Sequence, residues 1–279
     1  MKNSGFIFVL LTGLLVFSNP ISSSAQHENQ FSSFRKPNNG GVYVIAHRGA
    51  HNGIPENSLA AYQKAIDLGC DFVEIDVRTT KDGKFVSMHN SKIDSYVSGK
   101  TGKVSDFTLA EMRALDIGSR IGPEWKDTRI PTFEEILQLC RGKIGIYLDL
   151  KAASVPALVE IIRKYGMERD ILWYLEASRM KEIKEIAACC PECVPMPDPG
   201  PESNIDALMS QFPAKALATD LGELNEKFVN KAHQYQARVT VDDKEGTEKE
   251  WNQILDWKTD GIQTNYPEKL IPFLKKQRH

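Results

Sequence analysis

The sequence predicts an α/β protein, a (β/α)8 TIM barrel with an insertion on the C-terminal face of the barrel. Three observations predict this fold. Short β-branched runs alternate with helical patterns eight times after Gly41, as such a barrel requires. The chain has 279 residues, enough for one barrel of about 250 residues and a leader. Its composition, 41% hydrophobic and 26% charged, is that of a globular protein.

The charges of the chain are balanced. It has 35 basic and 37 acidic residues, a formal net charge of −2. A protein that neutralises nucleic-acid phosphates carries an excess of Lys and Arg. The composition therefore predicts no nucleic-acid partner.

The N-terminus has the layout of a secretory signal peptide. Lys2 supplies a positive charge, residues 5–17 form a 13-residue apolar run, and residues 18–25 are small and polar. A membrane span needs roughly 20 apolar residues, so an uncleaved anchor is the less favoured alternative. We expect residues 1–25 to be a signal peptide cleaved after Ala25. The mature protein is then exported, periplasmic or secreted, without stable membrane insertion.

The mature chain begins with a polar, aperiodic stretch at 26–40, which predicts a flexible leader. The barrel domain follows at 41–279. Its expected strands are Val42–Ala46, Phe72–Val77, Ile144–Leu150, Ile171–Leu175, Val194–Met196, Ala216–Thr219, Arg238–Val241 and Gly261–Thr264. Its expected helices are Ser58–Leu68, Thr132–Leu139, Val155–Tyr165, Arg179–Ala188, Ile205–Gln211, Asn225–Gln236, Lys249–Leu255 and Pro267–Lys275.

One segment departs from the alternation. Asp82-Gly83 lies between two β-prone runs and predicts a hairpin. The connection is too short for a parallel crossover, so the hairpin should return His89 to the end of the second strand. Residues 90–129 then form a long insertion with one short helix near Leu109–Leu115. Long excursions on this face usually build or cover a site.

All five cysteines, Cys70, Cys140, Cys189, Cys190 and Cys193, lie in the mature part. Export leads to an oxidising compartment, where disulfides form. The odd count leaves at least one cysteine free or paired between chains. A zinc site at Cys189, Cys190 and Cys193 would need a second Cys or His pair at the usual spacing, and the sequence lacks one. A zinc site is therefore the less favoured interpretation of this cluster. The sequence leaves open a Cys190–Cys193 disulfide, a Cys189–Cys193 disulfide and partly buried thiols.

Three carboxylates fall on neighbouring barrel strands. Glu74 and Asp76 lie two residues apart, so their side chains point to the same face, and Asp149 lies on the next barrel strand. Carboxylates that share a barrel mouth repel one another unless a cation lies between them. Oxygen ligands without a cysteine suit Mg²⁺ or Ca²⁺. A single Glu-x-Asp is more often a solvated face, and the joint position of all three favours a metal site.

Histidines and cations flank these acids. His47 and Arg48 end the first strand, His89 follows the hairpin, and Lys151 follows Asp149 by two residues. This set fits a phosphate ester as a small-molecule substrate. The metal and the cations would offset the charge of the phosphoryl oxygens, while one histidine takes a proton and the other gives one.

Short motifs along the chain carry a resemblance to a known family. They are Ala46-His47-Arg48-Gly49, Pro55-Glu56-Asn57-Ser58, Glu74-Ile75-Asp76-Val77, Thr80-Lys81-Asp82-Gly83, Met88-His89, Ile130-Pro131-Thr132-Phe133-Glu134-Glu135, Leu148-Asp149-Leu150-Lys151 and Asp260-Gly261-Ile262-Gln263-Thr264-Asn265-Tyr266-Pro267. The ordered set resembles the glycerophosphodiester phosphodiesterase family from about Val42 to Leu274. The resemblance implies a barrel of the phospholipase-C-like phosphodiesterase type. It also implies metal-dependent hydrolysis of glycerophosphodiesters to an alcohol and glycerol 3-phosphate.

The resemblance implies a role for each matching residue. The matches are the general acid/base pair His47 and His89, the metal-binding acids Glu74, Asp76 and Asp149, the phosphate-contacting cations Arg48 and Lys151, and Glu56 and Asn57 in an outer shell around the metal. Asn57-Ser58 is also a simple helix N-cap. Two alternatives stay open. One is another phosphodiester substrate (glycerophosphoinositol, a lysophospholipid or a teichoic-acid-like polymer), and the other is an inactive barrel that binds ligands.

The chain departs from the pattern of the family at several positions. Asn90 and Asn265 stand where the family usually has Asp, and Asp149 stands where it usually has Glu. Asp94-Ser95-Tyr96 replaces an Arg-Thr element, and the Trp common before Thr240 is absent. These departures bear on the substrate more than on the chemistry.

Overall fold

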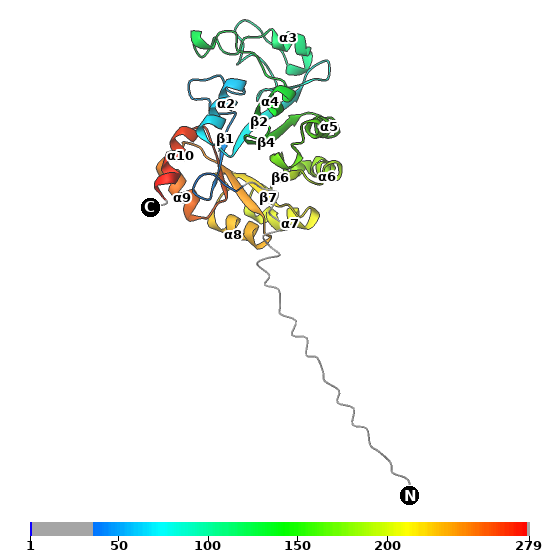
Figure 1. Ribbon diagram of the computed structural model, residues 1–279, viewed down its shortest axis with the longest axis vertical. Helices are drawn as coiled ribbons and strands as arrows, with labels where there is room; N and C mark the ends of the chain where they lie inside the picture. The colour runs from blue at the N-terminus through cyan, green and yellow to red at the C-terminus, as the bar shows by residue number, and fades with distance from the viewer. Residues whose placement is uncertain (2–35, 278–279) are drawn as a thin grey trace. The chain divides into compact units, whose positions relative to one another are not determined.

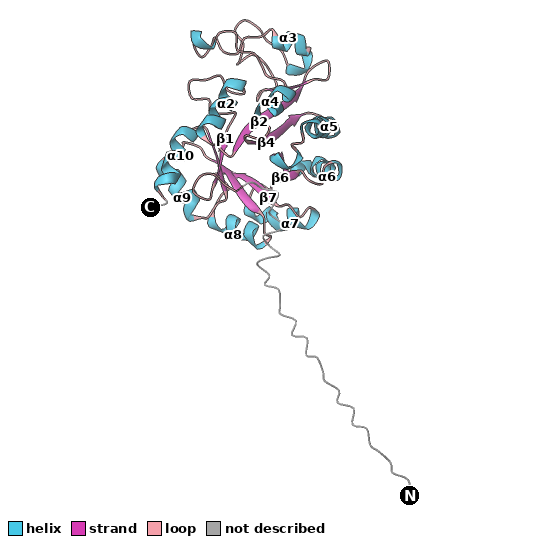
Figure 2. Ribbon diagram, in the orientation of Figure 1, coloured by secondary structure: helices cyan, strands magenta, loops and turns pink. Residues whose placement is uncertain are grey.

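Eight parallel strands make the wall of a barrel, and helices surround it in the computed structural model of the chain (Figures 1 and 2). The structure describes Met1 and residues 36–277. The predicted signal peptide and most of the predicted leader lie outside this part. The predicted (β/α)8 barrel is confirmed.

The elements follow the predicted order, with small shifts at their ends. The strands are β1 Tyr43–Ala46, β2 Phe72–Thr79, β3 Phe85–Ser87, β4 Gly145–Ala152, β5 Ile171–Glu176, β6 Val194–Asp198, β7 Ala216–Asp220, β8 Arg238–Asp242 and β9 Gly261–Thr264. The helices are α2 Leu59–Leu68, α3 Leu109–Arg113, α4 Phe133–Cys140, α5 Val155–Tyr165, α6 Met180–Cys189, α7 Ile205–Gln211, α8 Glu226–Gln234, α9 Glu248–Asp256 and α10 Pro267–Lys276.

The strands pair in the order β6-β5-β4-β2-β1-β9-β8-β7. Strands β6 and β7 are neighbours, yet among the described residues no ladder joins them. Pro195 and Pro197 on β6 explain this seam. In a parallel strand, the N–H groups of alternate residues point to opposite neighbours. Because β6 pairs with β5 along its whole length, Pro195 and Pro197 are turned toward β7, and proline has no N–H.

Alternation along the strands separates two hydrophobic clusters. On β1, Tyr43 and Ile45 belong to the cluster inside the barrel, and Val44 and Ala46 belong to the cluster between the barrel and its helices. Phe72 on β2 and Tyr147 on β4 also belong to the inner cluster. Every second residue after these positions therefore points into the barrel mouth.

The hairpin predicted at Asp82-Gly83 is confirmed. Strand β3 pairs antiparallel with the end of β2, with Val77 opposite Ser87 and Thr79 opposite Phe85. The loop closes through the Thr80 N–H, which donates to the Lys84 carbonyl at 2.8 Å. Beyond it the Met88 N–H donates to the Asp76 carbonyl at 2.9 Å, and this bond returns His89 to the barrel mouth as expected.

The insertion at 90–129 has a small core of its own. Its buried apolar residues join others from β3 and the segment before α4, in the set Val86, Met88, Ile93, Tyr96, Val104, Met112, Leu115, Ile117 and Ile130. Its helix α3 is shorter than predicted and ends at Arg113 rather than Leu115. This satellite core lets the insertion hold a fixed shape beside the barrel mouth.

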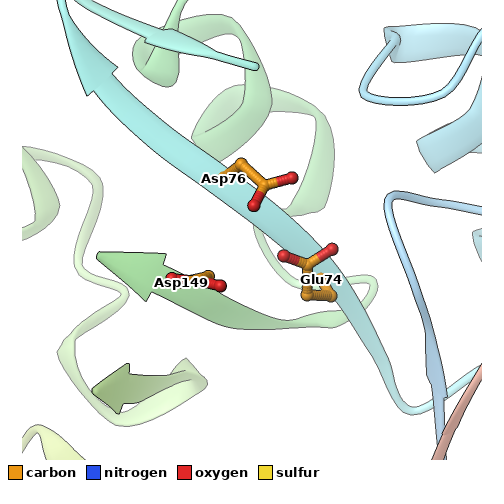
Figure 3. A group of neighbouring side chains, drawn as sticks. All are labelled: Glu74, Asp76 and Asp149. Atoms are coloured by element: carbon orange, nitrogen blue, oxygen red, sulfur yellow. The ribbon is translucent and has the colours of Figure 1, made fainter. Parts of the chain in front are cut away.

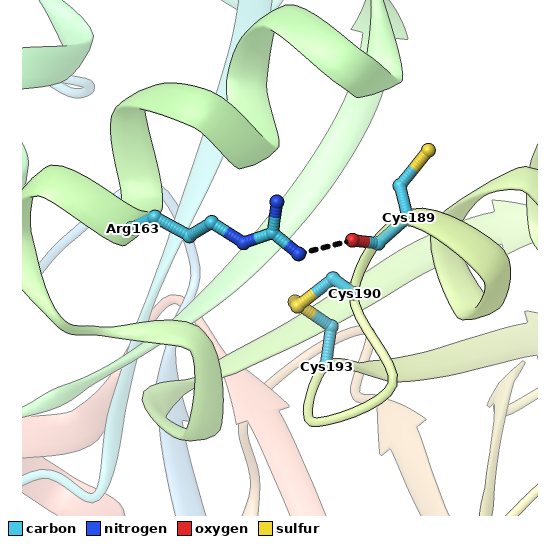
Figure 4. The surroundings of a disulfide bond; sticks show 4 residues. All are labelled: Arg163, Cys189, Cys190 and Cys193. Carbon is cyan, nitrogen blue, oxygen red and sulfur yellow. Dashed lines mark hydrogen bonds between the residues drawn. A yellow bond between two sulfur atoms is a disulfide. The ribbon is translucent and has the colours of Figure 1, made fainter.

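The cysteine alternatives are resolved in favour of one disulfide. Cys190 and Cys193 are bonded across the turn between α6 and β6, with 5.3 Å between their Cα atoms. The free Cys189 side chain points away from them (Figure 4). Its backbone carbonyl accepts a 2.5 Å hydrogen bond from Arg163. Cys70 and Cys140 are buried thiols.

The described end of the predicted leader contacts the barrel. The Asn38 N–H donates to Asp71 Oδ1 at 2.7 Å, and the Asn39 side-chain amide donates to the Gly69 carbonyl at 2.9 Å. Asn38 and Asn39 of the predicted leader are thus hydrogen-bonded to the barrel. Within the described residues, no helix combines the length and the apolar character that crossing a bilayer requires.

Candidate active site

Three acidic side chains meet at the C-terminal mouth of the barrel. Glu74 and Asp76 on β2 continue the inward series of Phe72, and Asp149 on β4 is the register partner of Asp76. One carboxylate oxygen from each lies within 4.8 Å of the others. Figure 3 shows the three side chains converging from the two strands. The sequence placed all three on one face, and the structure brings them together.

This cluster is electrostatically costly without a cation. Burial, followed by the charges of Asp76 and Asp149, raises the pKa of Glu74 well above its usual range. Burial likewise raises the pKa of Asp149. Asp76 Oδ1 is buried and has no hydrogen-bond partner, which is unusual for a native structure. A hard divalent cation fits this donor set, because it takes carboxylate oxygens and offsets their repulsion.

A series of buried hydrogen bonds through Asn57 holds Asp76 in place. Asn57 Nδ2 donates to Asp76 Oδ2 at 2.8 Å. Asn57 Oδ1 in turn accepts from Tyr62 Oη and Ser87 Oγ, each at 2.8 Å. Asn57 is 2% exposed and has a left-handed φ of 53°, a conformation that Asn tolerates better than most residues. These hydrogen bonds fix Oδ2 of Asp76, while its Oδ1 accepts no hydrogen bond from the described residues.

The loop after β1 positions Glu74. The Arg48 N–H donates to Glu74 Oε2 at 2.7 Å, and Arg48 itself adopts a φ of 53°. Gly49 follows with a φ of 83°, and a Cβ there would lie 2.7 Å from Ala61 Cβ on α2. Only glycine fits so close to the helix. The tight His47-Arg48-Gly49 turn therefore aims a backbone donor at the carboxylate.

Each histidine is oriented by an asparagine. His47 Nδ1 lies 2.8 Å from Asn265 Oδ1, and His89 Nδ1 lies 2.9 Å from Asn90 Oδ1. A carbonyl oxygen only accepts, so each Nδ1 carries the proton and the neutral ring presents a free Nε2. Burial, with a smaller contribution from the Arg48 charge, lowers the pKa of His47 to about 4. His47 is therefore neutral at pH 7.

Arg78 holds the backbone next to His89. Its Nε donates to the Met88 carbonyl at 3.0 Å, and its Nη2 donates to the His89 carbonyl at 2.5 Å. Arg78 lies on β2 two residues after Asp76. Spacing on the strand is the signal that could have identified it in the sequence.

The two predicted cations are both paired with carboxylates. Lys151 Nζ hydrogen-bonds Asp149 and lies 3.4 Å from Asp76 Oδ1. Burial acts to lower the pKa of Lys151, but the charges of Asp149 and Asp76 outweigh it and raise the pKa. Arg48 lies 3.2 Å from Glu56 Oε1 and 3.8 Å from Asp76 Oδ2. Both cations stay charged beside the acidic cluster.

Glu56 contacts Arg48 rather than the acidic cluster. Its Oε1 accepts from Arg48 Nη1 at 3.2 Å and from Tyr96 Oη at 3.1 Å. Tyr96 belongs to the core of the insertion. Glu56 thus links the β1 loop to the insertion.

One cavity of about 480 Å³ joins most of these groups. Its lining contains six residues that the sequence identified: His47, Arg48, Glu74, His89, Asp149 and Lys151. The cavity lining does not include Asp76, Glu56 or Asn57. These three residues lie behind the lining residues that they contact. Two histidines, two members of the acidic cluster and two positive side chains therefore share one polar cavity.

Sequence reasoning missed a row of acids on the other side of this cavity. Glu176, Asp198, Asp220 and Asp242 all line it. Each is the last residue of its strand, from β5 to β8. Their positions differ by 22 residues each time (198−176, 220−198, 242−220). This repeat is the signal that could have revealed the row.

Comparison with known proteins agrees with the motifs. The model of the glycerophosphoryl diester phosphodiesterase family matches residues 47–189. YhdW of Bacillus subtilis is 44% identical over 125 residues, which are 45% of this chain and 50% of that protein. A glycerophosphodiester phosphodiesterase of Caldanaerobacter subterraneus is 36% identical over 152 residues, 52% of this chain and 62% of that protein. The matched segments thus span less than two thirds of either relative.

A solved structure shares the fold. The Oleispira antarctica phosphodiesterase, in complex with the product sn-glycerol-3-phosphate, superimposes with a TM-score of 0.76 at 23% identity. The alignment covers 84% of this chain and 96% of that one. At this identity the likeness concerns the barrel architecture.

Proposed function

This chain belongs to the glycerophosphoryl diester phosphodiesterase family, and from that premise we propose that it hydrolyses glycerophosphodiesters to an alcohol and glycerol 3-phosphate. One observation carries the proposal: both histidines line the polar cavity that also contains the acidic cluster. The named activity of the Caldanaerobacter relative and the product bound by the Oleispira enzyme support the same reaction.

Glu74, Asp76 and Asp149 are the residues that would hold a divalent metal, Mg²⁺ or Ca²⁺. Asp76 Oδ1, which accepts no hydrogen bond from the described residues, and the mutual repulsion of the three acids support this assignment. A metal bound there would supply a Lewis acid that offsets negative charge on the phosphoryl oxygens. Arg48 and Lys151 add fixed positive charge to the same wall of the cavity.

The two histidines take opposite roles in proton transfer. His47, neutral at pH 7, accepts the proton of the attacking hydroxyl at Nε2 because its Nδ1 proton is committed to Asn265. His89, which lines the same cavity and whose Nδ1 contacts Asn90, gives a proton from Nε2 to the departing alkoxide. The attacking hydroxyl is the glycerol hydroxyl next to the phosphoester, which forms a new P–O bond as the P–O bond of the leaving alcohol breaks. Water then opens the resulting cyclic phosphate to glycerol 3-phosphate.

A direct assay tests the reaction. We expect the purified mature protein to release glycerol 3-phosphate from glycerophosphoethanolamine in the presence of Mg²⁺ or Ca²⁺. EDTA should abolish the release, and excess metal should restore it. Release of glycerol with a phosphorylated alcohol, or activity that survives EDTA, would contradict the proposal.

The cavity favours a small polar diester over a lysophospholipid. Its lining is mostly charged or polar side chains, with Leu150 and Leu175 as its aliphatic members. An acyl chain would gain little there, because apolar burial requires apolar surface on both sides. Glycerophosphodiesters are therefore the substrates that we propose.

We also propose that the chain is exported to the periplasm or the medium. The support is the pattern of Lys2, the apolar run at 5–17 and the small residues before Gln26. The mature protein recovered from the exporting cell should begin at Gln26, as read by N-terminal sequencing. Recovery of Met1 on the cytoplasmic protein would refute export.

A further inference from the structure

The cavity has two walls of different composition, one that combines cations with the acidic cluster and one that is mainly acidic. Arg48 and Lys151 lie on the wall that carries the metal-binding acids, at the C-terminal ends of β1, β2 and β4. The opposite wall consists of the strand ends from β5 to β8 and carries the acidic row, Glu176, Asp198, Asp220 and Asp242. A phosphodiester held by the first wall would extend its remaining part toward the second.

The acidic row has no cationic partner within the described part of the chain. None of its four carboxylates takes part in an ion pair there. Asp198 Oδ1 accepts only from the Gly200 N–H at 2.8 Å, and Asp220 Oδ1 from the Gly222 N–H at 2.5 Å. Burial, followed by the charges of Asp243 and Asp220, raises the pKa of Asp242 to about 7. Arg179 lines the same cavity but pairs with Glu182, and the charge of Arg48 acts to lower the pKa of Asp242. The row is thus acidic and has no direct ion-pair partner among the described residues.

Gln263 gives a second, independent sign of a ligand. Its side chain is 7% exposed and faces the same cavity. Its amide hydrogen-bonds Asp242, while its Oε1 is buried without any hydrogen-bond partner. A buried acceptor left unpaired has lost its hydrogen bonds to water without replacement, which is unfavourable. An N–H donor on a bound molecule would satisfy Oε1 and the neighbouring carboxylates together.

We infer that the acidic row and Gln263 Oε1 bind a primary ammonium group on the alcohol half of the substrate. The row thereby selects glycerophosphodiesters of amino alcohols over those of neutral alcohols. This inference rests on the proposed function and deepens it. The phosphate would lie against Arg48, Lys151 and the acids that would hold a divalent cation, and the ammonium group against the acidic row, so the cavity would match a zwitterion. A polyanionic chain would meet repulsion at the row.

Two isosteric diesters test the inference. Glycerophosphoethanolamine carries an ammonium group where glycerophospho(ethylene glycol) carries a hydroxyl. We expect kcat/KM to be about tenfold or more higher for the charged diester, since hydrogen bonds to charged groups contribute about 1.5–3 kcal/mol. In the Asp198→Asn/Asp220→Asn double variant the ratio of the two values should fall close to one. Asparagine keeps an oxygen acceptor for Gly200 and Gly222 and removes only the charge.

Asp256→Asn is the matched control. Asp256 is exposed at the end of α9 and is not among the cavity-lining residues, so the ratio should keep its wild-type value. A wild-type ratio near one, or an unchanged ratio in a double variant with native circular dichroism, overturns the inference and leaves the hydrolase function standing. If neither diester is hydrolysed, the proposed function fails instead. Calorimetric binding of the two diesters in EDTA then decides the inference, which requires the same tenfold preference.

Discussion

Replacing His47 by alanine is expected to lower kcat for glycerol 3-phosphate release by about 10²- to 10⁴-fold, the usual contribution of a positioned general base. His47 is half-buried, neutral at pH 7 and fixed by the 2.8 Å contact between its Nδ1 and Asn265 Oδ1. Alanine removes the acceptor for the proton of the nucleophile and leaves the acidic cluster in place. The drop should therefore appear in kcat while metal binding persists, as a metal-dependent rise in Tm reports.

His233→Ala supplies the control for this variant. His233 lies on α8 and hydrogen-bonds Asp260 at 2.9 Å, and it is not among the cavity-lining residues. Its loss removes one imidazole without touching the site, so kcat should stay within about twofold. If His47→Ala kept more than a tenth of the wild-type kcat, the proposed role of His47 would be wrong.

Asp76→Asn is expected to lower the rate of glycerol 3-phosphate release by more than about 100-fold, because a metal contributes several kcal/mol to the stabilisation of phosphoryl charge. Asp76 forms the acidic cluster with Glu74 and Asp149, and its Oδ1 accepts no hydrogen bond from the described residues. An asparagine preserves the acceptor for Asn57 Nδ2 but carries no charge. The variant should also lose most of the Tm rise that Mg²⁺ or Ca²⁺ gives the wild-type protein, since a ligand that binds only the folded state raises Tm.

The thermal shift separates a lost metal site from a lost fold. Native circular dichroism in EDTA would show that Asp76→Asn still folds. Asp67→Asn, on the outer helix α2, makes the same change of charge outside the cavity lining and should keep both the activity and the shift. A full metal-dependent shift in Asp76→Asn would show that the ion binds elsewhere.

Strand alternation made much of the site predictable from the sequence. Glu74 and Asp76 lie two apart on a strand, and Asp149 and Lys151 repeat that spacing on the next barrel strand. A period of two fixes the face to which such pairs point, whatever the rest of the fold does. The hairpin at Asp82-Gly83 likewise follows from local turn chemistry. These features depend on neighbours in the sequence.

Other parts of the site depend on contacts between distant segments. Asn57 contacts Asp76, Tyr62 and Ser87, and its backbone takes a left-handed φ. No local pattern indicates those partners, and Asn57 could be interpreted only as a cap or by resemblance. Glu56 was placed near the metal by its motif, while the structure shows it on Arg48 and Tyr96. The acidic row was missed because its members lie one full βα unit apart.

The seam between β6 and β7 bears on how this barrel avoids self-association. An opened strand edge is a template on which a foreign chain can add a strand and start an aggregate. Two of the five residues of β6, Pro195 and Pro197, have no N–H to offer such a strand. Transient opening at the seam would expose an edge that is already blunted. The two prolines that interrupt the hydrogen bonding of the barrel wall therefore also disfavour the addition of a foreign strand to β6.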